Sequence, residues 1–355
     1  MAFLNKSMPL SIMPKTLFQK VDCFILLNFH DHWKNPLINK YLPGEASEHY
    51  EGMLLVSKNK KPLWVSHPFN YKQAKKEFSA HAQVATYNTK KELTKLLKKN
   101  CGLRVGFDSS FTSVASLKSL HKMLKGKKLV DVSEELGKSR EVKEKNEVKN
   151  LLTAVRATRN ALEKAKKALK KGMSEKDLAE LITNWLKEEG YKTAFCIVAF
   201  KENTSHIHHA PTSTKKLSFG MPVLIDCGAK HNGYIADLTE TFWFGPKEGK
   251  AYKEFESARK KVEECLFAVE KMLLPGTKIE VLWKKTASLG KMPHALGHGI
   301  GVETHDHPKG LGDKTKWALK EGMVLAIEPA LYINRKFGVR IEKDYLITAR
   351  GKREL

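Results

Sequence analysis

The sequence predicts a small α/β domain followed by a larger α+β domain. Over about the first 130 residues, apolar runs of strand length alternate with stretches of helical periodicity. The remainder combines three long amphipathic helices with two pairs of strands. Between the two parts, residues 137–147 are highly charged and carry almost no apolar side chains, which is typical of a domain boundary. We therefore expect domains at residues 1–135 and 136–355.

In the first domain, apolar runs predict strands and lysine-rich periodic segments predict helices. The expected strands are residues 21–28, 52–56, 62–65 and 103–107, and the expected helices are residues 71–78 and 90–97. Because strands alternate with helices, we predict a mostly parallel sheet with helices on its faces. His30 and His32 follow the first strand and are expected to be solvated, so this domain shows no chemistry of its own.

Three long helices are expected in the second domain. Apolar side chains recur at helical spacing in each, and each ends at a glycine or a proline. Ser174 and Asp177 have the spacing of an N-terminal capping box for the second helix. The helices are expected to begin near Val148, Ser174 and Tyr252 and to stop at Gly172, Gly190 and Pro275.

Residues 223–244 have the pattern of a β-hairpin, since two apolar runs flank a short polar turn. If the turn is centred between His231 and Asn232, Asp226 stands directly opposite Asp237. Two carboxylates so close in an apolar ladder would repel each other and lose hydration, so a positive group must lie between them. At this point the alternative stays open that both aspartates lie near strand ends and are solvated.

A second hairpin repeats the arrangement in residues 326–341. Centring its turn on Arg335 places Glu328 opposite Glu342. A chain that twice sets acidic residues across from each other inside apolar strands builds an oxygen-rich cage for metal ions. The sequence therefore predicts a metal centre.

His294 and His298 lie between the hairpins and offer a neutral ligand. Their spacing resembles that of the helical zinc motif. However, no glutamate follows His294, and glycines stand at 297, 299 and 301, which disfavours a helix. We expect these histidines on a strand or a loop.

The net charge of +24 raises the question of a nucleic-acid partner. Most lysines lie at helical spacing opposite apolar positions, with little aromatic interleaving and no arginine-rich stripe. Solvated helix faces are therefore the preferred explanation, and nucleic-acid binding is not expected beyond weak attraction at low salt.

The five cysteines are odd in number and lack CxxC spacing, which indicates a reducing compartment. No apolar run reaches the roughly 18 residues that span a bilayer. The first residues contain lysines at 6 and 15 but no continuous apolar segment, so no secretion signal is expected. A cytoplasmic location is the expectation, with no membrane partner.

Five residues resemble, in order and approximate spacing, the ligands of the pita-bread metallopeptidases, the M24 family of methionine aminopeptidase, aminopeptidase P and prolidase: Asp226, Asp237, His298, Glu328 and Glu342. The supporting motifs are Gly297-His298-Gly299-Ile300-Gly301, His305 with Pro308, Glu328-Pro329 and Gly338-Val339-Arg340-Ile341-Glu342. The resemblance is strong over residues 140–355. Residues 20–130, with the motif at residues 39–44, more weakly resemble the creatinase-type, ribonuclease H-like N-terminal domain. That extra domain favours the proline-specific branch of the family.

The resemblance implies two divalent metal ions, with Mn²⁺ preferred and Co²⁺, Fe²⁺ or Zn²⁺ possible. Asp226 would chelate one ion, Asp237 and Glu342 would bridge both, and His298 and Glu328 would complete the second. The metals would supply hydroxide at neutral pH for attack on the scissile carbonyl, with Glu328 as proton acceptor.

The resemblance also implies the substrate, a peptide or dipeptide with proline at its second position. His209 and His305 would donate hydrogen bonds to the tetrahedral intermediate. His294 would lie near the leaving group, and Arg340 would brace the bridging carboxylates or face a substrate carboxylate. Adjacent His208 competes for the role of His209. The family arrangement further implies a homodimer.

Two positions depart from the family pattern. Ala330 replaces a glycine after Glu-Pro, and Glu240 replaces an arginine between two threonines, so the substrate pocket is open to change. Two other classes of function remain as alternatives. One is a pita-bread binding protein without catalysis, which would usually lack ligands, and the other is a nucleic-acid-associated role driven by the lysine excess.

Overall fold

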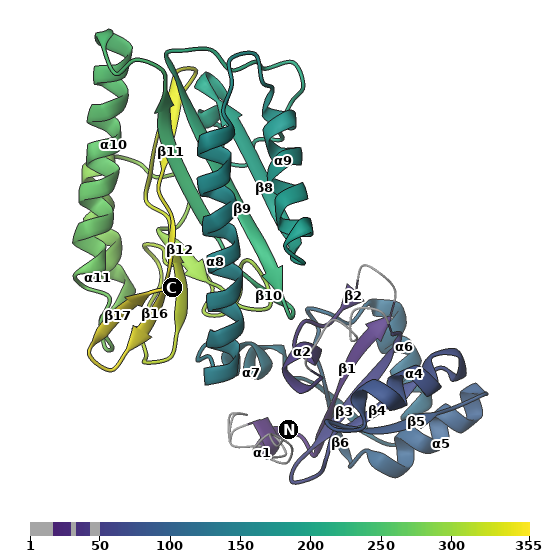
Figure 1. Cartoon of the computed structure of the whole chain (residues 1–355). Coiled ribbons are helices and arrows are strands. Elements are labelled where there is room, and N and C mark those ends of the chain that lie inside the picture. Colours follow the sequence, from purple (N-terminus) through teal and green to yellow (C-terminus); the bar gives the residue numbers. More distant parts are fainter. Residues whose placement is uncertain (1–16, 30–32, 43–49) are drawn as a thin grey trace. The chain divides into compact units, whose positions relative to one another are not determined.

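The computed structural model describes residues 17–29, 33–42 and 50–355 (Figure 1). The chain divides into two compact units, Met1–Ser139 and Arg140–Leu355. The expected boundary at residues 135 and 136 falls within helix α7 (Ser133–Lys138). His30 and His32, the lysines at 6 and 15, and residues 43 and 44 of the creatinase-like motif lie outside the described residues.

The first unit is built on a seven-stranded sheet with the order β5-β4-β3-β1-β6-β7, in which β2 pairs with β1. Apolar clusters cover both faces, one beneath α1, α2, α4 and α7 and the other beneath α5 and α6. The strands are β1 (Cys23–Phe29), β2 (Trp33–Lys34), β3 (Gly52–Ser57), β4 (Leu63–Ser66), β5 (Gln83–Thr86), β6 (Arg104–Phe107) and β7 (Lys128–Asp131), and the other helices are α1 (Leu17–Lys20), α2 (Ile38–Tyr41), α4 (Pro68–Phe78), α5 (Lys90–Asn100) and α6 (Val114–Met123).

The prediction of a mostly parallel sheet is wrong, because the sheet is mixed. β1 pairs with β6, β6 with β7, and β4 with β5 in parallel, whereas β3 runs antiparallel to both of its neighbours, β1 and β4. The lysine-rich connection from Ser57 to Leu63 is too short for a crossover, and a short connection allows only an antiparallel pair. The predicted helices at residues 71–78 and 90–97 are confirmed as parts of α4 and α5.

The second unit contains two larger sheets and a small hairpin, flanked by long helices (Figure 1). β9 pairs with β8, β10 and β11, a second sheet has the order β12-β13-β16-β17, and β14 pairs with β15. The helices are α8 (Lys145–Ala168), α9 (Glu175–Glu188), α10 (Gly249–Glu270) and α11 (Ile279–Trp283), with 3-10 turns η2 (Lys201–Ser205) and η3 (Lys284–Leu289), and the strands are β8 (Lys192–Phe200), β9 (Met221–His231), β10 (Tyr234–Ile235), β11 (Leu238–Phe244), β12 (Gly297–Gly299), β13 (Val324–Ile327), β14 (Ala330–Ile333), β15 (Phe337–Arg340), β16 (Lys343–Thr348) and β17 (Gly351–Glu354).

Two apolar cores hold these layers together. Helices α8 and α9 pack on β8 and β9 through one cluster, and α10 and α11 pack on β13, β15 and β16 through another. The predicted capping box at the start of α9 is confirmed, since Ser174 Oγ accepts from the Asp177 amide and the Asp177 carboxylate accepts from the Ser174 amide. Helix α8 ends at Ala168, a few residues before the predicted end at Gly172. Gly172 lies in the turn that follows the helix, where its φ is 87°.

The first hairpin has a different register from the predicted one. His231 pairs with Tyr234, so the loop consists of Asn232 and Gly233, both at positive φ (50° and 87°). Such a two-residue loop favours Asn-Gly and fixes the register. Asp226 therefore pairs with Thr239, and the prediction that it stands directly opposite Asp237 is wrong.

The second hairpin has the predicted register, because Ala330 pairs with Arg340 and Ile333 with Phe337 around Arg335. The ladder ends at the pair of Ala330 and Arg340, so each strand stops two residues short of its glutamate, Glu328 or Glu342. A pairing of the two glutamates is therefore not part of the ladder.

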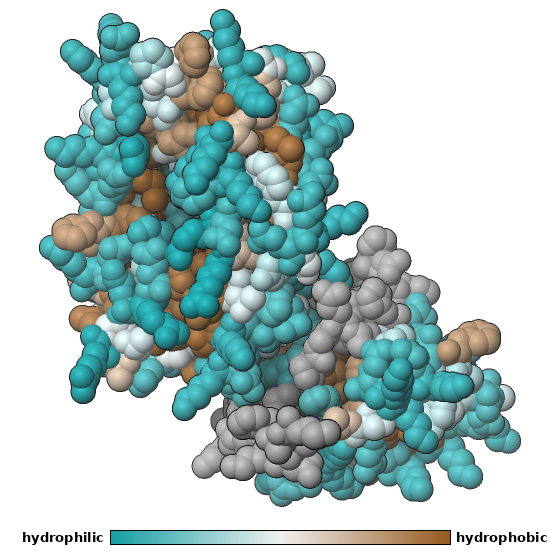
Figure 2. All heavy atoms as spheres, in the orientation of Figure 1, coloured by the Kyte–Doolittle hydropathy of each residue, from teal (hydrophilic) through white to brown (hydrophobic). Residues whose placement is uncertain are grey.

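The exposed surface is mainly hydrophilic on the face shown in Figure 2. On α5 the lysines are exposed while Leu93 and Leu97 are buried, which confirms the expected solvated helix face there. Apolar side chains gather between α8 and α10 (Figure 2), where Leu162, Leu238 and Leu266 line a hollow of about 370 Å³. No helix within the described ranges combines the length and apolar character of a membrane span.

Candidate metal centre

One cavity in the second unit collects the predicted site residues. Its volume is about 900 Å³, and its walls come from both hairpins and from the segment around β12. The five predicted ligands enter it from different elements: Asp226 from β9, Asp237 from between β10 and β11, His298 from β12, Glu328 from after β13, and Glu342 from between β15 and β16. The walls also include His208, His209, His294, His305 and Arg340.

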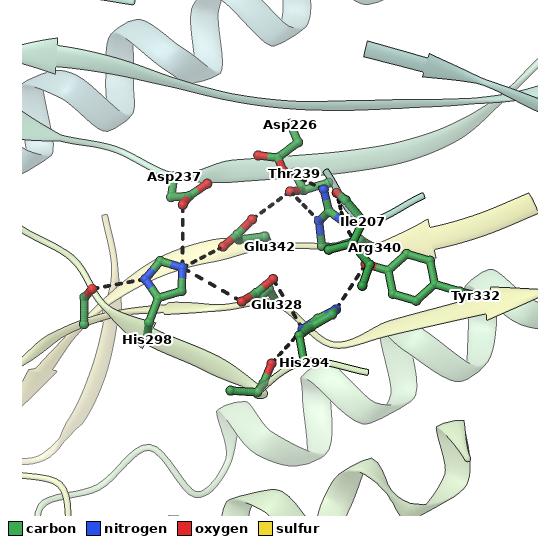
Figure 3. A network of polar contacts seen from close by, with 12 residues as sticks. Ile207, Asp226, Asp237, Thr239, His294, His298, Glu328, Tyr332, Arg340 and Glu342 are labelled. Atoms are coloured by element: carbon green, nitrogen blue, oxygen red, sulfur yellow. Dashed lines mark hydrogen bonds and ion pairs between the residues drawn. The ribbon is translucent and has the colours of Figure 1, made fainter. Parts of the chain in front are cut away.

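His298 is the centre of the cluster (Figure 3). Its Nδ1 lies 3.1 Å from the carbonyl oxygen of Gly299, which can only accept, so Nδ1 carries the proton. Three carboxylates surround the other ring nitrogen, Nε2, at 3.6 Å (Asp237), 3.8 Å (Glu342) and 3.9 Å (Glu328). Burial and the neighbouring His305 lower the pKa of His298 to about 4, so the ring is neutral at pH 7. The lone pair on Nε2 then faces three carboxyl groups, each of which in its ionised form can also only accept.

The carboxylates destabilise one another when no cation is present. Burial raises the pKa of Asp237 and Glu328 well above their ordinary values and that of Glu342 to about 7. Repulsion from Glu342 adds to the first two shifts, and repulsion from Asp226 adds to all three. Asp226 Oδ1 and Glu342 Oε1 are buried and have no hydrogen-bond partner within the described part of the chain. Ligand atoms of Asp237, His298 and Glu342 lie within 4.8 Å of one another. This donor set fits divalent cations.

Hydrogen bonds to a backbone amide and from a side-chain hydroxyl position two of the acidic residues. At the break between β10 and β11, the Asp237 amide donates to Asp344 Oδ2 at 3.0 Å. Thr239, which pairs with Asp226, donates from Oγ1 to Glu342 Oε2 at 2.7 Å. Asp226 and Asp237 therefore reach the same cavity without standing opposite each other, because a shift of two residues keeps a side chain on the same face of the strand.

Arg340 is an internal brace (Figure 3). It is only 2% exposed and donates from Nη2 to Asp226 Oδ2 at 2.6 Å, from Nη1 to the Tyr332 hydroxyl at 2.7 Å, and from Nε to Thr239 Oγ1 at 3.2 Å. These contacts orient Asp226 and leave little of the guanidinium for a substrate. The geometry favours the structural role, but the carboxylate that Arg340 holds is Asp226 and not one of the two that were predicted to bridge the metals.

His294 and His305 both line the cavity. Tyr332 links His294 to Arg340, since its hydroxyl lies 3.1 Å from His294 Nε2. The His305 ring packs edge-on against His298 with centroids 4.3 Å apart. Burial lowers the pKa of both His294 and His305, so both are neutral at pH 7 and each can donate one hydrogen bond.

His208 and His209 differ in their surroundings. His209 Nε2 lies 2.8 Å from Glu175 Oε2, and Glu175, fully buried, also accepts from Phe200, Asn203 and Thr212. Because the carboxylate only accepts, it fixes the His209 tautomer with the proton on Nε2. His208 is exposed at the cavity wall.

The two departures from the family pattern lie outside this cavity. Glu240 turns toward α8, where its Oε2 lies 2.5 Å from Lys166 Nζ. Ala330 is buried in the β14–β15 pair, opposite Arg340. Neither lines the cavity.

The sequence interpretation missed four supporting residues, Glu175, Thr239, Tyr332 and Asp344. Their contacts join segments that are 34, 103, 38 and 107 positions apart in the chain, so spacing gave no signal for them. Only Thr239 could have been found, because it shares a strand face with Asp237.

Comparison with known proteins identifies the family. Residues 149–349 match the model of metallopeptidase family M24, and residues 35–142 match the creatinase/prolidase N-terminal domain. The chain belongs to metallopeptidase family M24. This confirms the predicted family and its two-part architecture, and the centre described above is a feature of an M24 chain.

The relatives of this M24 chain match it along nearly its whole length. It is 28% identical over 330 residues to the Xaa-Pro dipeptidase of Pyrococcus furiosus, covering 90% of each chain. The prolidase structure from Pyrococcus horikoshii OT3 superposes with a TM-score of 0.83 at 26% identity, covering 96% of this chain and 95% of that one. The X-Pro aminopeptidase structure from Thermotoga maritima gives 0.83 at 23% identity, covering 94% and 95%, and supports the fold alone. The predicted pita-bread fold is confirmed.

Proposed function

We propose that this M24 chain is a dinuclear metal peptidase that hydrolyses the bond between an N-terminal residue and a following proline. One observation supports it most: the unprotonated Nε2 of His298 faces three buried carboxylates at 3.6–3.9 Å, an arrangement that a divalent cation would stabilise. The Xaa-Pro specificity is suggested by the relatives that cover nine tenths of the chain and are named Xaa-Pro dipeptidases.

The proposed ligands are Asp226, Asp237, His298, Glu328 and Glu342. Four carboxylates and one imidazole form a hard donor set that suits Mn²⁺. When bound, two such ions would supply Lewis acidity, which acidifies water and polarises the scissile carbonyl.

The protein's own groups would handle protons and orientation. Glu328, whose pKa is raised by burial and by Glu342, would accept the proton of the attacking water. His305 would donate a hydrogen bond to the oxyanion, and His294 would lie beside the leaving group. The predicted donation from His209 does not fit this geometry, because its Nε2 proton goes to Glu175 and the same tautomer leaves Nδ1 as an acceptor. Glu175 would keep His209 in one tautomer.

Lys309 favours dipeptides within this substrate class. It lines the cavity and forms no ion pair within the described ranges, whereas the guanidinium of Arg340 is engaged by Asp226. A free ammonium group at this position suits the carboxylate of an Xaa-Pro dipeptide, which a longer peptide lacks at that place.

The direct test is hydrolysis by protein stripped of metal and then reloaded. Stripped protein should be inactive, and Mn²⁺ should restore cleavage of an Xaa-Pro dipeptide. An Xaa-Pro-Yaa tripeptide and an Xaa-Ala dipeptide serve as comparisons, and the metal bound per chain is measured by elemental analysis, with two ions expected. Binding of two ions without hydrolysis of any substrate would instead identify a non-catalytic binding protein.

A homodimer and a cytoplasmic location are further proposals that rest on the family resemblance and on cysteine usage. The oligomeric state is tested by sedimentation analysis of the full chain. A strictly monomeric protein with full activity would contradict the first of them.

A further inference from the structure

The loop of residues 299–308 carries His305 and is closed on itself. The Gly299 amide donates to the Pro308 carbonyl at 2.9 Å, and the Asp306 amide donates to the Gly299 carbonyl at 2.8 Å. Because these bonds fix the two ends of the loop, the shape of its tip decides where the His305 ring lies. That ring stands 4.3 Å from the His298 ring at the cavity wall.

Asp306 shapes the tip from inside. Its side chain is almost fully buried, with Oδ2 accepting from the Val302 amide at 3.1 Å and Oδ1 accepting from the His307 amide at 2.7 Å. A Cβ at position 301 would come within 2.2 Å of Oδ2, so Gly301 is needed for the carboxylate to sit there. Asp306 thus bonds backbone groups on both sides of His305.

Arg140 reaches this carboxylate from outside the loop. Its guanidinium is buried, with Nε 3.1 Å from Asp306 Oδ1 and Nη1 2.6 Å from Glu303 Oε2. One turn of chain later, Lys143 Nζ donates to the His307 carbonyl at 2.7 Å. The charged stretch at residues 137–147 therefore contacts the loop on both sides of His305, through Arg140 and Lys143.

The segment that carries these two cations is itself anchored. The Lys143 amide donates to the Gly322 carbonyl at 2.8 Å, and Val142 bridges to Met323, at the foot of β13. Neither Arg140 nor Asp306 lines the cavity. Any effect of Arg140 and Asp306 on the reaction must therefore act through the loop of residues 299–308.

We propose that Arg140, through Asp306, is a positioning element for His305. The inference deepens the proposed function, since it adds to the same site a residue that touches neither metal nor substrate. Removing the guanidinium would leave Asp306 buried without its counter-charge, and such a loss loosens the structure around the remaining charge. His305 would then sample positions away from the oxyanion, while the five metal ligands, held by other contacts, would remain in place.

The test is a double-mutant cycle between Arg140→Gln and His305→Ala. Arg140→Gln should lower kcat by about 10- to 100-fold, the range known for groups that orient active-site ligands, with KM and bound metal unchanged. In the His305→Ala background the same substitution should change kcat less than about twofold. Arg140→Lys keeps the positive charge but not the planar set of guanidinium donors, so its loss of kcat should be smaller than that of Arg140→Gln.

A matched control is Arg259→Gln, which removes an arginine from an exposed ion pair with Glu263 on α10 and should leave kcat unchanged. Equal losses from Arg140→Gln in both backgrounds, or loss of bound metal, would overturn the proposal. If Arg140→Gln does not fold, Asp306→Asn is taken through the same cycle with the same expectations.

A second readout separates this proposal from the proposed function. The ring resonances of His305, assigned by their absence in His305→Ala, should shift or broaden in Arg140→Gln, while those of His121, which belongs to the first unit, stay unchanged. This outcome supports positioning even if the wild-type protein cleaves no Xaa-Pro peptide. Unchanged His305 resonances would refute it even if the enzyme is active.

Discussion

At the scale of single residues, the site is defined by which ring nitrogen of a histidine holds the proton. The Gly299 carbonyl keeps it on Nδ1 of His298, and the Glu175 carboxylate keeps it on Nε2 of His209. The ring of His298 therefore presents an unprotonated Nε2 to the carboxylates, whereas the ring of His209 donates its Nε2 proton to Glu175. The histidines themselves were readable from the sequence. The partner of His209 was not, because Glu175 lies 34 positions away in the chain.

Metal uptake should release protons near neutral pH. Without metal, the pKa of Glu342 is raised to about 7 and those of Asp237 and Glu328 are raised well above their ordinary values, so the folded site holds protons that a metal must displace. The apparent affinity for Mn²⁺ should therefore rise with pH through about 7. His298 adds no such dependence there, because its pKa is lowered to about 4 and it is already neutral. Calorimetric titrations in buffers of different ionisation enthalpy measure the protons released, and zero release at pH 6.5 would contradict the expectation.

Lys309→Ala should weaken dipeptide binding selectively. A charge-assisted hydrogen bond contributes about 1.5–3 kcal/mol, so loss of one to a substrate carboxylate predicts a rise in KM of roughly 10-fold or more. KM for an Xaa-Pro-Yaa peptide should change little, because its carboxylate is on the third residue and would lie one residue beyond Lys309. Steady-state kinetics on the two substrates decide the matter, and equal changes on both would remove Lys309 from dipeptide recognition.

At the scale of elements, turn chemistry decided which carboxylates meet. The polar segment at residues 230–233 correctly indicated a hairpin, but its centre was misplaced by one position. The Asn-Gly pair forms the loop because both residues accept positive φ. The second hairpin, centred on Arg335 at φ of 60°, was placed correctly. Strand existence and face thus followed from pattern, whereas exact pairing depended on two dihedral angles.

Gly233→Ala tests the importance of this turn. A Cβ at φ of 87° is strained, so we expect a loss of about 1–3 kcal/mol in the free energy of unfolding. Because the turn sets the register of Asp226 and Asp237, affinity for metal should fall as well. Denaturant unfolding and metal titration measure the two effects. Asn232→Gly is the matched control and should be nearly neutral, since glycine adopts positive φ without strain.

At the scale of the whole molecule, the metal centre belongs entirely to residues 140–355. The proposed ligands lie on or beside strands of both larger sheets of this unit, so a bound ion would join parts that are distant in sequence. The first unit has its own two apolar cores and contributes none of the proposed ligands.

Metal should therefore stabilise the two units unequally. At a concentration of 100 times Kd, a ligand adds about 2.7 kcal/mol to the stability of the state that binds it. Hydrogen exchange should slow in β9, β11 and β12 when Mn²⁺ is added, while β1 and β3 exchange as before. Mass spectrometry of the exchanged peptides gives the answer, and uniform slowing in both units would argue against a centre confined to the second.

The sequence by itself determined the residue types of the centre, the two-part organisation, the main helices and the positions of the hairpins. These follow from periodicity, from turn residues and from the family motif, all of which are local in the chain. Only the tertiary structure decided the register that aligns Asp226 with Thr239, the use of Arg340 as a brace, and the grip of Arg140 on the loop of His305. The register depends on the dihedral angles of the two turn residues, Asn232 and Gly233. The other two features depend on contacts between residues more than about 10² positions apart in the chain, and packing alone brings such residues together.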